Sequence, residues 1–286
     1  MVKHCSRVLA LLLLLTAPLA AQSVETDIER VRETLVRNFQ RSKLLIALTE
    51  LEWRPGLHAG VARLAAGETI SQSLWLEAGR EYAFIGSGGP EVTDLDVYLR
   101  RAGGAALTSD QEPDPSPVVS FVPPKTGAYV LQLHLVGSTE PEALVSFNAL
   151  ATAGTDLVEE DFRNVLRQFG FSHRALHDLE PDLRLTDAPG QWLLYGLLVD
   201  EANPVVMHDL RPGGPTCYVA TAGSEQFSAI DLYMGDPDGS IVSGDTADDA
   251  LPLLIFDPQP ATPYRLRAEG RGSDGPALLL LGFYQK

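Results

Sequence analysis

An internal repeat is the feature that most constrains the fold of this chain. A shift of 135 residues places Asp94–Leu131 on Ala229–Leu266 without a gap, and ten of the 38 aligned positions are identical. Chance would give about two or three identities, because common residues each fill only roughly 5–8% of positions. The identical pairs are Asp96/Asp231, Tyr98/Tyr233, Gly104/Gly239, Asp110/Asp245, Asp114/Asp249, Pro117/Pro252, Phe121/Phe256, Pro123/Pro258, Tyr129/Tyr264 and Leu131/Leu266. The repeat predicts two copies of one structural unit.

A helix is predicted at the start of each copy. Leu35–Phe39 parallels Val165–Phe169 at a slightly different shift. Apolar residues recur at mostly helical spacing between Glu25 and Trp53, where Arg54-Pro55-Gly56 ends the first helix. The second helix is predicted to begin at a cap on Thr155 or Asp156, to break or bend at Gly170 and to end at Glu180-Pro181.

Short β-strands account for most of the remaining chain. They are rich in β-branched and aromatic residues and are separated by Gly, Pro and Asp, which is typical of a sandwich or barrel. The predicted strands are Ser73–Leu76, Glu81–Ile85, Leu95–Leu99, Val118–Val122 and Tyr129–Leu135 in the first copy, and Leu193–Val199, Cys217–Thr221, Ile230–Met234, Leu253–Phe256, Tyr264–Ala268 and Ala277–Tyr284 in the second.

The N-terminus has the pattern of a Sec-type secretory signal. Lys3 and Arg7 precede the apolar run Val8–Leu15, and small residues follow it, so cleavage is predicted before Gln22. The alternative is a membrane anchor that stays, but the apolar run is shorter than the roughly 20 residues that span a bilayer. We therefore expect a periplasmic or secreted protein without a stable membrane anchor after cleavage.

The charge of the chain limits the kinds of partner that it can bind, and its cysteine content limits how the fold is stabilised. The formal net charge is −16, from 38 acidic and 22 basic residues. A phosphate backbone needs clustered Lys and Arg, so we expect no nucleic-acid partner. After signal cleavage Cys217 is the single cysteine, which excludes an intrachain disulfide and leaves packing to stabilise the fold. Its apolar neighbours favour a buried residue over a nucleophile.

The first copy contains a series of short motifs: Asp94–Leu99, Gly103-Gly104, Ser109-Asp110, Pro117–Phe121 and Thr126–Tyr129. In these residues it resembles the bacterial pre-peptidase C-terminal domain, a jelly-roll-like β-sandwich found on secreted bacterial proteins and related to the collagen-binding modules of collagenases. The second copy is similar but lacks the first Asp, at Ala229, and the Gly before Tyr, at Thr262. The resemblance implies an extracytoplasmic accessory or binding module.

Together these features predict a mainly β protein of two tandem jelly-roll-like β-sandwiches, each preceded by an α-helix. The expected division of the chain is a signal peptide at 1–21, an N-terminal helix at 22–54, a first sandwich at 55–152, a helical linker at 153–182 and a second sandwich at 183–286.

Clustered carboxylates are the candidate metal ligands. Asp94, Asp96 and Asp110 in the first copy and Asp231 and Asp245 in the second offer the hard oxygens that Ca²⁺ prefers. The alternative interpretation is that these residues form turns and solubilise strand edges, since no EF-hand loop is present. Calcium is therefore the cofactor that these carboxylates would take.

A second metal interpretation involves one helix face. His173 and His177 have the i, i+4 spacing that can hold Zn²⁺, although Arg174 stands where a zinc protease motif has Glu. A solvated helix face is the alternative for this pair.

Aromatic residues are candidates for a sugar-binding platform. Trp53, Trp75 and Trp192 are the three tryptophans, and the alternating strand around Trp75 predicts that its side chain lies in the core. Trp53 and Trp192, at the ends of elements, are also expected to pack inside.

No catalytic motif is present, since the Gly-rich stretch around Ser87 lacks the spacing of a nucleophile elbow. We therefore expect a non-catalytic exported protein that binds another exported protein or a polysaccharide. One alternative is an inert structural periplasmic protein whose two sandwiches pack face to face. Another is an unrecognised hydrolase, which a pocket holding His134 or His208 against a carboxylate would favour.

Overall fold

The described part of the protein is mainly β, with two helices. The computed structural model describes residues 5–186, 190–273 and 275–286, and describes side chains from residue 27 onward. The first half contains α1 (Cys5–Leu48), β1 (Leu51–Trp53), β2 (Gly56–Ala65), β3 (Thr69–Leu76), β4 (Tyr82–Gly88), β5 (Val92–Arg101), β6 (Ala106–Asp110), β7 (Val118–Phe121), β8 (Gly127–Ser138) and β9 (Glu142–Thr152). The second half contains α2 (Glu159–Leu179), β10 (Arg184–Leu185), β11 (Trp192–Val199), β12 (Val205–Leu210), β13 (Cys217–Gly223), β14 (Ala229–Gly235), β15 (Ile241–Asp245), β16 (Leu253–Phe256), β17 (Tyr264–Arg271) and β18 (Ala277–Gln285).

These strands form three antiparallel sheets. The largest sheet runs β16-β13-β18-β11-β2-β9-β4-β7, with β1 added beside β9 and β10 beside β18. Two four-stranded sheets run β3-β8-β5-β6 and β12-β17-β14-β15. Within each half, a four-stranded sheet lies against four strands of the large sheet, and side chains from both layers form one apolar core. The predicted mainly β, sandwich-like fold is confirmed, and the strands have the same order in both halves.

The two halves join edge to edge through one continuous sheet. β2 and β11 pair antiparallel, with Gly60 opposite Tyr195. Phe147 and Trp192 pack edge to face across this seam with ring centroids 5.2 Å apart. Gly60 lies beneath the two rings, where a Cβ atom would be 2.7 Å from Phe147. This arrangement differs from the face-to-face packing that the structural alternative expected, because the contact is made by backbone pairing between sheet edges.

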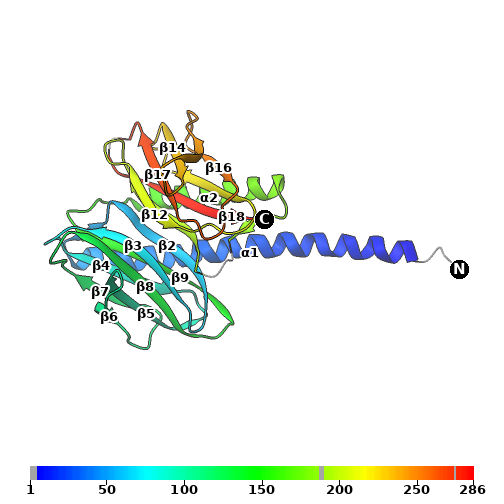
Figure 1. Cartoon of the computed structure of the whole chain (residues 1–286). Coiled ribbons are helices and arrows are strands. Elements are labelled where there is room, and N and C mark those ends of the chain that lie inside the picture. The colour runs from blue at the N-terminus through cyan, green and yellow to red at the C-terminus, as the bar shows by residue number, and fades with distance from the viewer. Residues whose placement is uncertain (1–4, 187–189, 274) are drawn as a thin grey trace.

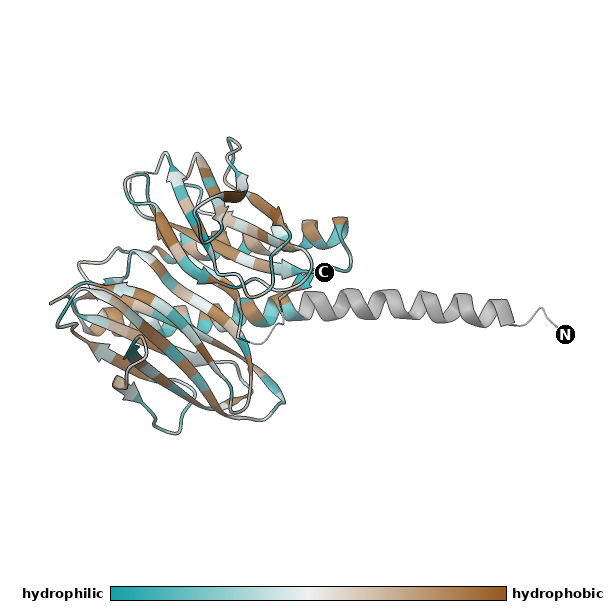
Figure 2. Ribbon diagram, in the orientation of Figure 1, coloured by the Kyte–Doolittle hydropathy of each residue, from teal (hydrophilic) through white to brown (hydrophobic). Residues whose placement is uncertain are grey.

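Both helices cover the opposite face of the large sheet (Figure 1). Phe39 of α1 stacks on Phe162 of α2 with centroids 4.0 Å apart, and on Trp53 with centroids 4.9 Å apart. Strands of the large sheet are therefore buried on both faces, which explains why β11, β13 and β18 are apolar at consecutive positions. Figure 2 shows apolar residues, in brown, along strands of both halves.

The helix boundaries differ from those predicted. α1 ends at Leu48, whereas periodicity extended it to Trp53, because Leu51–Trp53 pairs with β9 as β1. α2 begins after Val158 without a side-chain cap, and it continues through Gly170. Phe169 and His173 are buried on either side of Gly170, so their packing outweighs the cost of about 1 kcal/mol that glycine adds to a helix.

The predicted signal peptide at residues 1–21 lies outside the residues whose side chains are described, and its cleavage stays a prediction. Over the described ranges, the chain has no helix with enough length and hydrophobicity to span a membrane.

Candidate functional site

A groove lies between the two halves, above the seam of β2 and β11. Its facing walls include β3 and β12, which are the outermost strands of the two four-stranded sheets. The groove has a volume of about 1040 Å³. A smaller hollow of about 120 Å³ continues it, since Gln72, Ser73, His208 and Asp209 line both cavities. The groove is thus built from side chains of both halves.

Trp75 lies on the β3 wall of the groove and is 63% exposed. Its predicted burial in the core is wrong. Side chains alternate along β3, and Leu74 and Leu76 point into the sandwich, so Trp75 shares the outward face with Ser73. Across the sheet Trp75 faces Ala128, whose small side chain leaves the indole open. The burial predicted for the other two tryptophans is confirmed: Trp53 and Trp192 lie in the core.

Side chains cap the outward carbonyl groups of β3. The Trp192 indole N–H donates to the Ser71 carbonyl at 3.2 Å, and the Gln72 amide donates to the Ser73 carbonyl at 2.9 Å. Such caps blunt a sheet edge, because a free row of carbonyl groups would pair with another strand.

Arg54 provides the third cap and the positive charge at the base of the groove. Its guanidinium donates to the Trp75 carbonyl at 2.9 Å and also to the Leu57 carbonyl. Burial lowers the pKa of Arg54 to about 10. The side chain therefore stays charged at neutral pH and fixes the backbone that carries the Trp75 indole.

A β-bulge shapes the opposite wall. The register of β12 against β17 shifts between Met207 and Leu210, and Asp209 adopts a φ of 60°. Asp is one of the residues that tolerate this left-handed conformation. Because a bulge breaks the strict alternation of side chains, the exposed residues His208 and Asp209 both line the groove.

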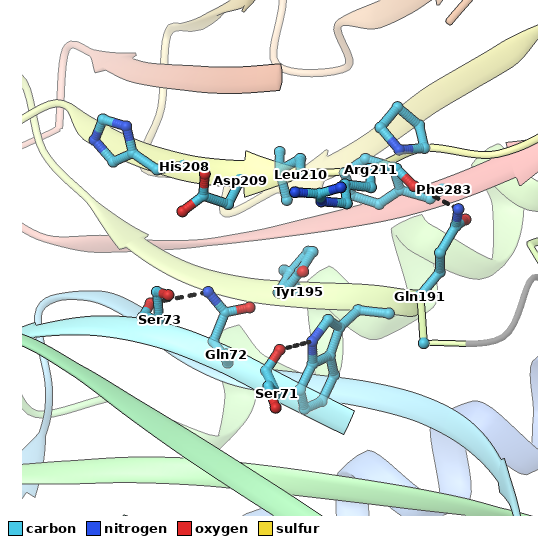
Figure 3. A pocket seen from close by; sticks show the side chains of 13 residues that line it. Ser71, Gln72, Ser73, Gln191, Tyr195, His208, Asp209, Leu210, Arg211 and Phe283 are labelled. Carbon is cyan, nitrogen blue, oxygen red and sulfur yellow. Dashed lines mark hydrogen bonds between the residues drawn. The ribbon is translucent and has the colours of Figure 1, made fainter. Parts of the chain in front are cut away.

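The smaller hollow is lined by a tyrosine whose hydroxyl group meets solvent. Tyr195 of β11 is 4% exposed and lines the hollow beside Gln72, His208 and Asp209 (Figure 3). No hydrogen bond from a described residue reaches its hydroxyl group, and burial raises the pKa of that group. The ring of Tyr195 is buried, and its hydroxyl group borders the hollow, where it can bond to water or to a ligand.

Two of the predicted calcium ligands act as turn acceptors. Asp110 accepts the N–H of Glu112 at 3.1 Å and of Val118 at 2.8 Å. Asp245 makes the equivalent bonds in the second half, to Ala247 at 3.1 Å and to Leu253 at 2.9 Å. These hydrogen bonds account for both aspartates as structural residues of one turn that occurs in each half.

The other predicted ligands do not gather around one point. Asp96 accepts from the Tyr98 hydroxyl at 2.7 Å, and Asp231 pairs with Arg271 at 2.8 Å. The pKa of Asp94 is raised, first by burial and then by neighbouring carboxylates. In the described part of the chain, no three His, Cys, Asp or Glu side chains are placed to hold a metal ion. Calcium binding stays a prediction.

The predicted zinc pair is split by burial. His173 is buried against Tyr284, with its Nδ1 atom 3.2 Å from the Tyr284 hydroxyl, and burial lowers its pKa to about 4. His173 therefore lies on the buried face of α2, in the core, and not on a solvated helix face.

The groove also holds His208 next to Asp209, the kind of pair that the hydrolase alternative requires. Over the described residues, however, no hydrogen bond joins His208 to Asp209 or to Ser71 or Ser73, so no nucleophile, base and orienting acid are linked. His134 lies elsewhere, with its Nδ1 atom 3.0 Å from Thr69 Oγ1 and from the Glu68 carbonyl.

Cys217 has none of the features of a reactive cysteine. Cys217 is buried in β13, as predicted, and burial raises the pKa of its thiol to about 12. The thiolate, which is the nucleophilic form, is not populated at neutral pH.

Comparison with known proteins gives structural neighbours only. No protein-family model matches the chain, and no curated protein matches it in sequence. One similar structure is PliG of Aeromonas hydrophila, a periplasmic inhibitor of g-type lysozyme, with 15% identity over 34% of this chain and 88% of that chain and a TM-score of 0.26. Another is the pre-peptidase C-terminal domain of a Bacillus anthracis collagenase, with 13% identity over 34% of this chain and 93% of that chain and a TM-score of 0.27. Similarity of this extent assigns neither a family nor a function.

Proposed function

We propose that this chain is an exported, non-catalytic binding protein that holds a macromolecular ligand in the groove between its two halves. One observation carries the proposal: an exposed tryptophan, Trp75, forms the wall of a cavity of about 1040 Å³. Tryptophan is enriched among the residues that dominate binding energy, because it buries a large apolar area on contact.

The architecture supports this proposal. We infer that the two halves are tandem copies of one pre-peptidase C-terminal-like sandwich, since their sheets share one strand order. The groove walls are then equivalent edge strands, β3 and β12, that have diverged in sequence. Equivalent strands that differ in sequence around a cavity are expected where the cavity has been selected to bind a ligand. An inert structural protein would need only the pairing of β2 with β11 to hold its halves together.

The expected setting of the protein follows from its N-terminus. The signal-like segment at residues 1–21 directs the chain to the periplasm or the exterior, where the ligand is an exported protein or a polysaccharide. Among the described residues no hydrogen bond joins His208 to Asp209, and this supports a binding role for the groove over a hydrolytic one.

Co-sedimentation with the insoluble cell-envelope fraction of the producing bacterium tests this function. The mature protein, from Gln22 onward, should pellet with the envelope, and Trp75→Ala should reduce binding by about tenfold or more, as expected for a central aromatic contact. Phe171→Ala is the matched control, because Phe171 is 62% exposed on α2, across the large sheet from the groove. Equal binding by wild type and Trp75→Ala would contradict the proposal.

A further inference from the structure

The residues that line the groove indicate the chemical class of its ligand, an inference that rests on the proposed function. We propose that it binds a segment of an uncharged polysaccharide, with one sugar ring stacked on Trp75 and a neighbouring ring hydrogen-bonded in the hollow beside Tyr195.

The first observation is the open indole face. Ala128 lies directly across from Trp75 in β8, and Ala102 lines the same cavity. Both side chains are small, so the ring of Trp75 remains uncovered. A pyranose ring presents an apolar face of C–H groups that carry partial positive charge, and an aromatic face carries the complementary negative charge.

The second observation is the set of polar groups next to that ring. The hollow presents the Tyr195 hydroxyl, the His208 imidazole and the Asp209 carboxylate, together with the Ser73 hydroxyl. Sugar hydroxyl groups both donate and accept, and this set offers both donors and acceptors. The Tyr195 hydroxyl has no partner among the described residues, so a ligand hydroxyl group there would satisfy it without displacing an existing bond.

The third observation disfavours an extended peptide as the occupant. A peptide that adds to a sheet edge bonds to the free backbone groups of that edge. The carbonyl groups of Ser71, Ser73 and Trp75 already accept hydrogen bonds from side chains. Strand addition at β3 would require those bonds to break, whereas stacking on Trp75 leaves them intact.

The charge and the volume of the groove limit the charge and the length of the ligand. The groove holds cations, Arg54 and Arg265, as well as anions, Asp200 and Asp209. Neither sign dominates there, and the whole chain carries −16, which repels a strongly anionic polymer. The volume of about 1040 Å³ lies at the upper end of the range for small-molecule sites, so the groove accommodates more than one sugar ring.

Tryptophan fluorescence provides the test, because Trp53 and Trp192 are buried and Trp75 is exposed. The mature protein is titrated with cellohexaose, chitohexaose and maltohexaose, and with the strand-forming peptide Lys-Thr-Val-Thr-Val-Thr-Lys. We expect at least one hexaose to shift or quench the emission, and calorimetry to give a Kd for that hexaose.

Two variants locate the site. Tyr195→Phe should weaken binding of that hexaose by about 5- to 20-fold, the loss expected for one hydrogen bond between the ligand and this hydroxyl group. Its melting temperature should equal that of wild type, because the removed hydroxyl has no protein partner. Trp75→Ala should abolish detectable binding in calorimetry, and Phe171→Ala should bind as wild type does.

The outcomes separate the two proposals. If the protein pellets with the envelope in a Trp75-dependent way but no hexaose binds, or if the peptide binds in their place, the polysaccharide inference is wrong and the binding function stands. If neither the envelope nor any probe binds, both fail. If Tyr195→Phe binds the hexaose with wild-type affinity, the ligand does not contact the hollow beside Tyr195, and that part of the inference is wrong.

Discussion

Two buried histidines under the helices should make the folded protein sensitive to mild acid. His58 lies in β2 against Trp53, and His173 lies in α2 against Tyr284. Burial is the main cause that lowers the pKa of His58 to about 3 and that of His173 to about 4, from an ordinary value of 6.5. Both side chains are therefore neutral in the folded state at neutral pH.

The direction of the pH effect follows from these values. Because the folded pKa lies below the unfolded value, each histidine contributes its full stabilisation above about pH 6.5, and the contribution is lost as the pH falls from there toward the folded pKa. At pH 5 the unfolded state binds protons that the folded state does not. With about 1.36 kcal/mol per pH unit, each of His58 and His173 then costs about 2 kcal/mol of the free energy of unfolding.

Urea unfolding followed by circular dichroism measures this loss. Between pH 7.5 and pH 5, wild type should lose about 4 kcal/mol more than the double variant His58→Gln, His173→Gln, which has neither group to protonate. His208→Gln is the matched control, since His208 is exposed in the groove. The reasoning is refuted if the double variant loses stability with falling pH as steeply as wild type does.

Three further predictions concern the seam, the turns and the metal. Gly60→Ala should lower the free energy of unfolding by about 1–3 kcal/mol, because the new Cβ would lie 2.7 Å from Phe147. Gly170→Ala, with open space around its Cβ position, should be neutral or stabilising, and chemical denaturation compares the two variants. Asp110→Ala and Asp245→Ala should each destabilise the fold by about 1–2 kcal/mol and to a similar extent, since each removes two equivalent acceptors, and a loss in one half alone would argue against a shared turn. If Ca²⁺ binds at the predicted aspartates, the melting temperature of the mature protein should be higher in Ca²⁺ than in chelator, and an unchanged value would exclude a calcium site that stabilises the fold.

The sequence predicted the fold class better than it predicted the seam. Short strands rich in β-branched residues fall where period-two patterns and turn residues place them, as in Leu95–Leu99 and Tyr129–Leu135. β2 was not predicted, because Gly56–Ala65 includes His58, Gly60 and Arg63 and shows no clean alternation. Yet β2 forms the seam, since its Gly60 makes room for the two rings that cross it.

The candidate site could not be predicted from the sequence for two other reasons. Trp75 stands in an alternating strand, but a period of two does not tell which of its two faces is buried. In the structure Leu74 and Leu76 occupy the buried face of β3, and Trp75 is therefore on the exposed face. The groove itself arises only when β2 pairs with β11, so residues more than a hundred positions apart, such as Ser71 and Trp192, come into contact. Local pattern carries no signal for such a pairing.

The edge-to-edge seam also bears on how such a chain can arise. β2 and β11 hold the same place in the strand order of their halves, and they pair antiparallel. Two identical strands that pair antiparallel are related by a two-fold axis, which is the geometry of a symmetric dimer. A single ancestral unit with this edge would have had a homodimer available to it before gene fusion. Fusion of two such units would free the two facing strands to acquire different side chains, an asymmetry that no homodimer can have about its axis.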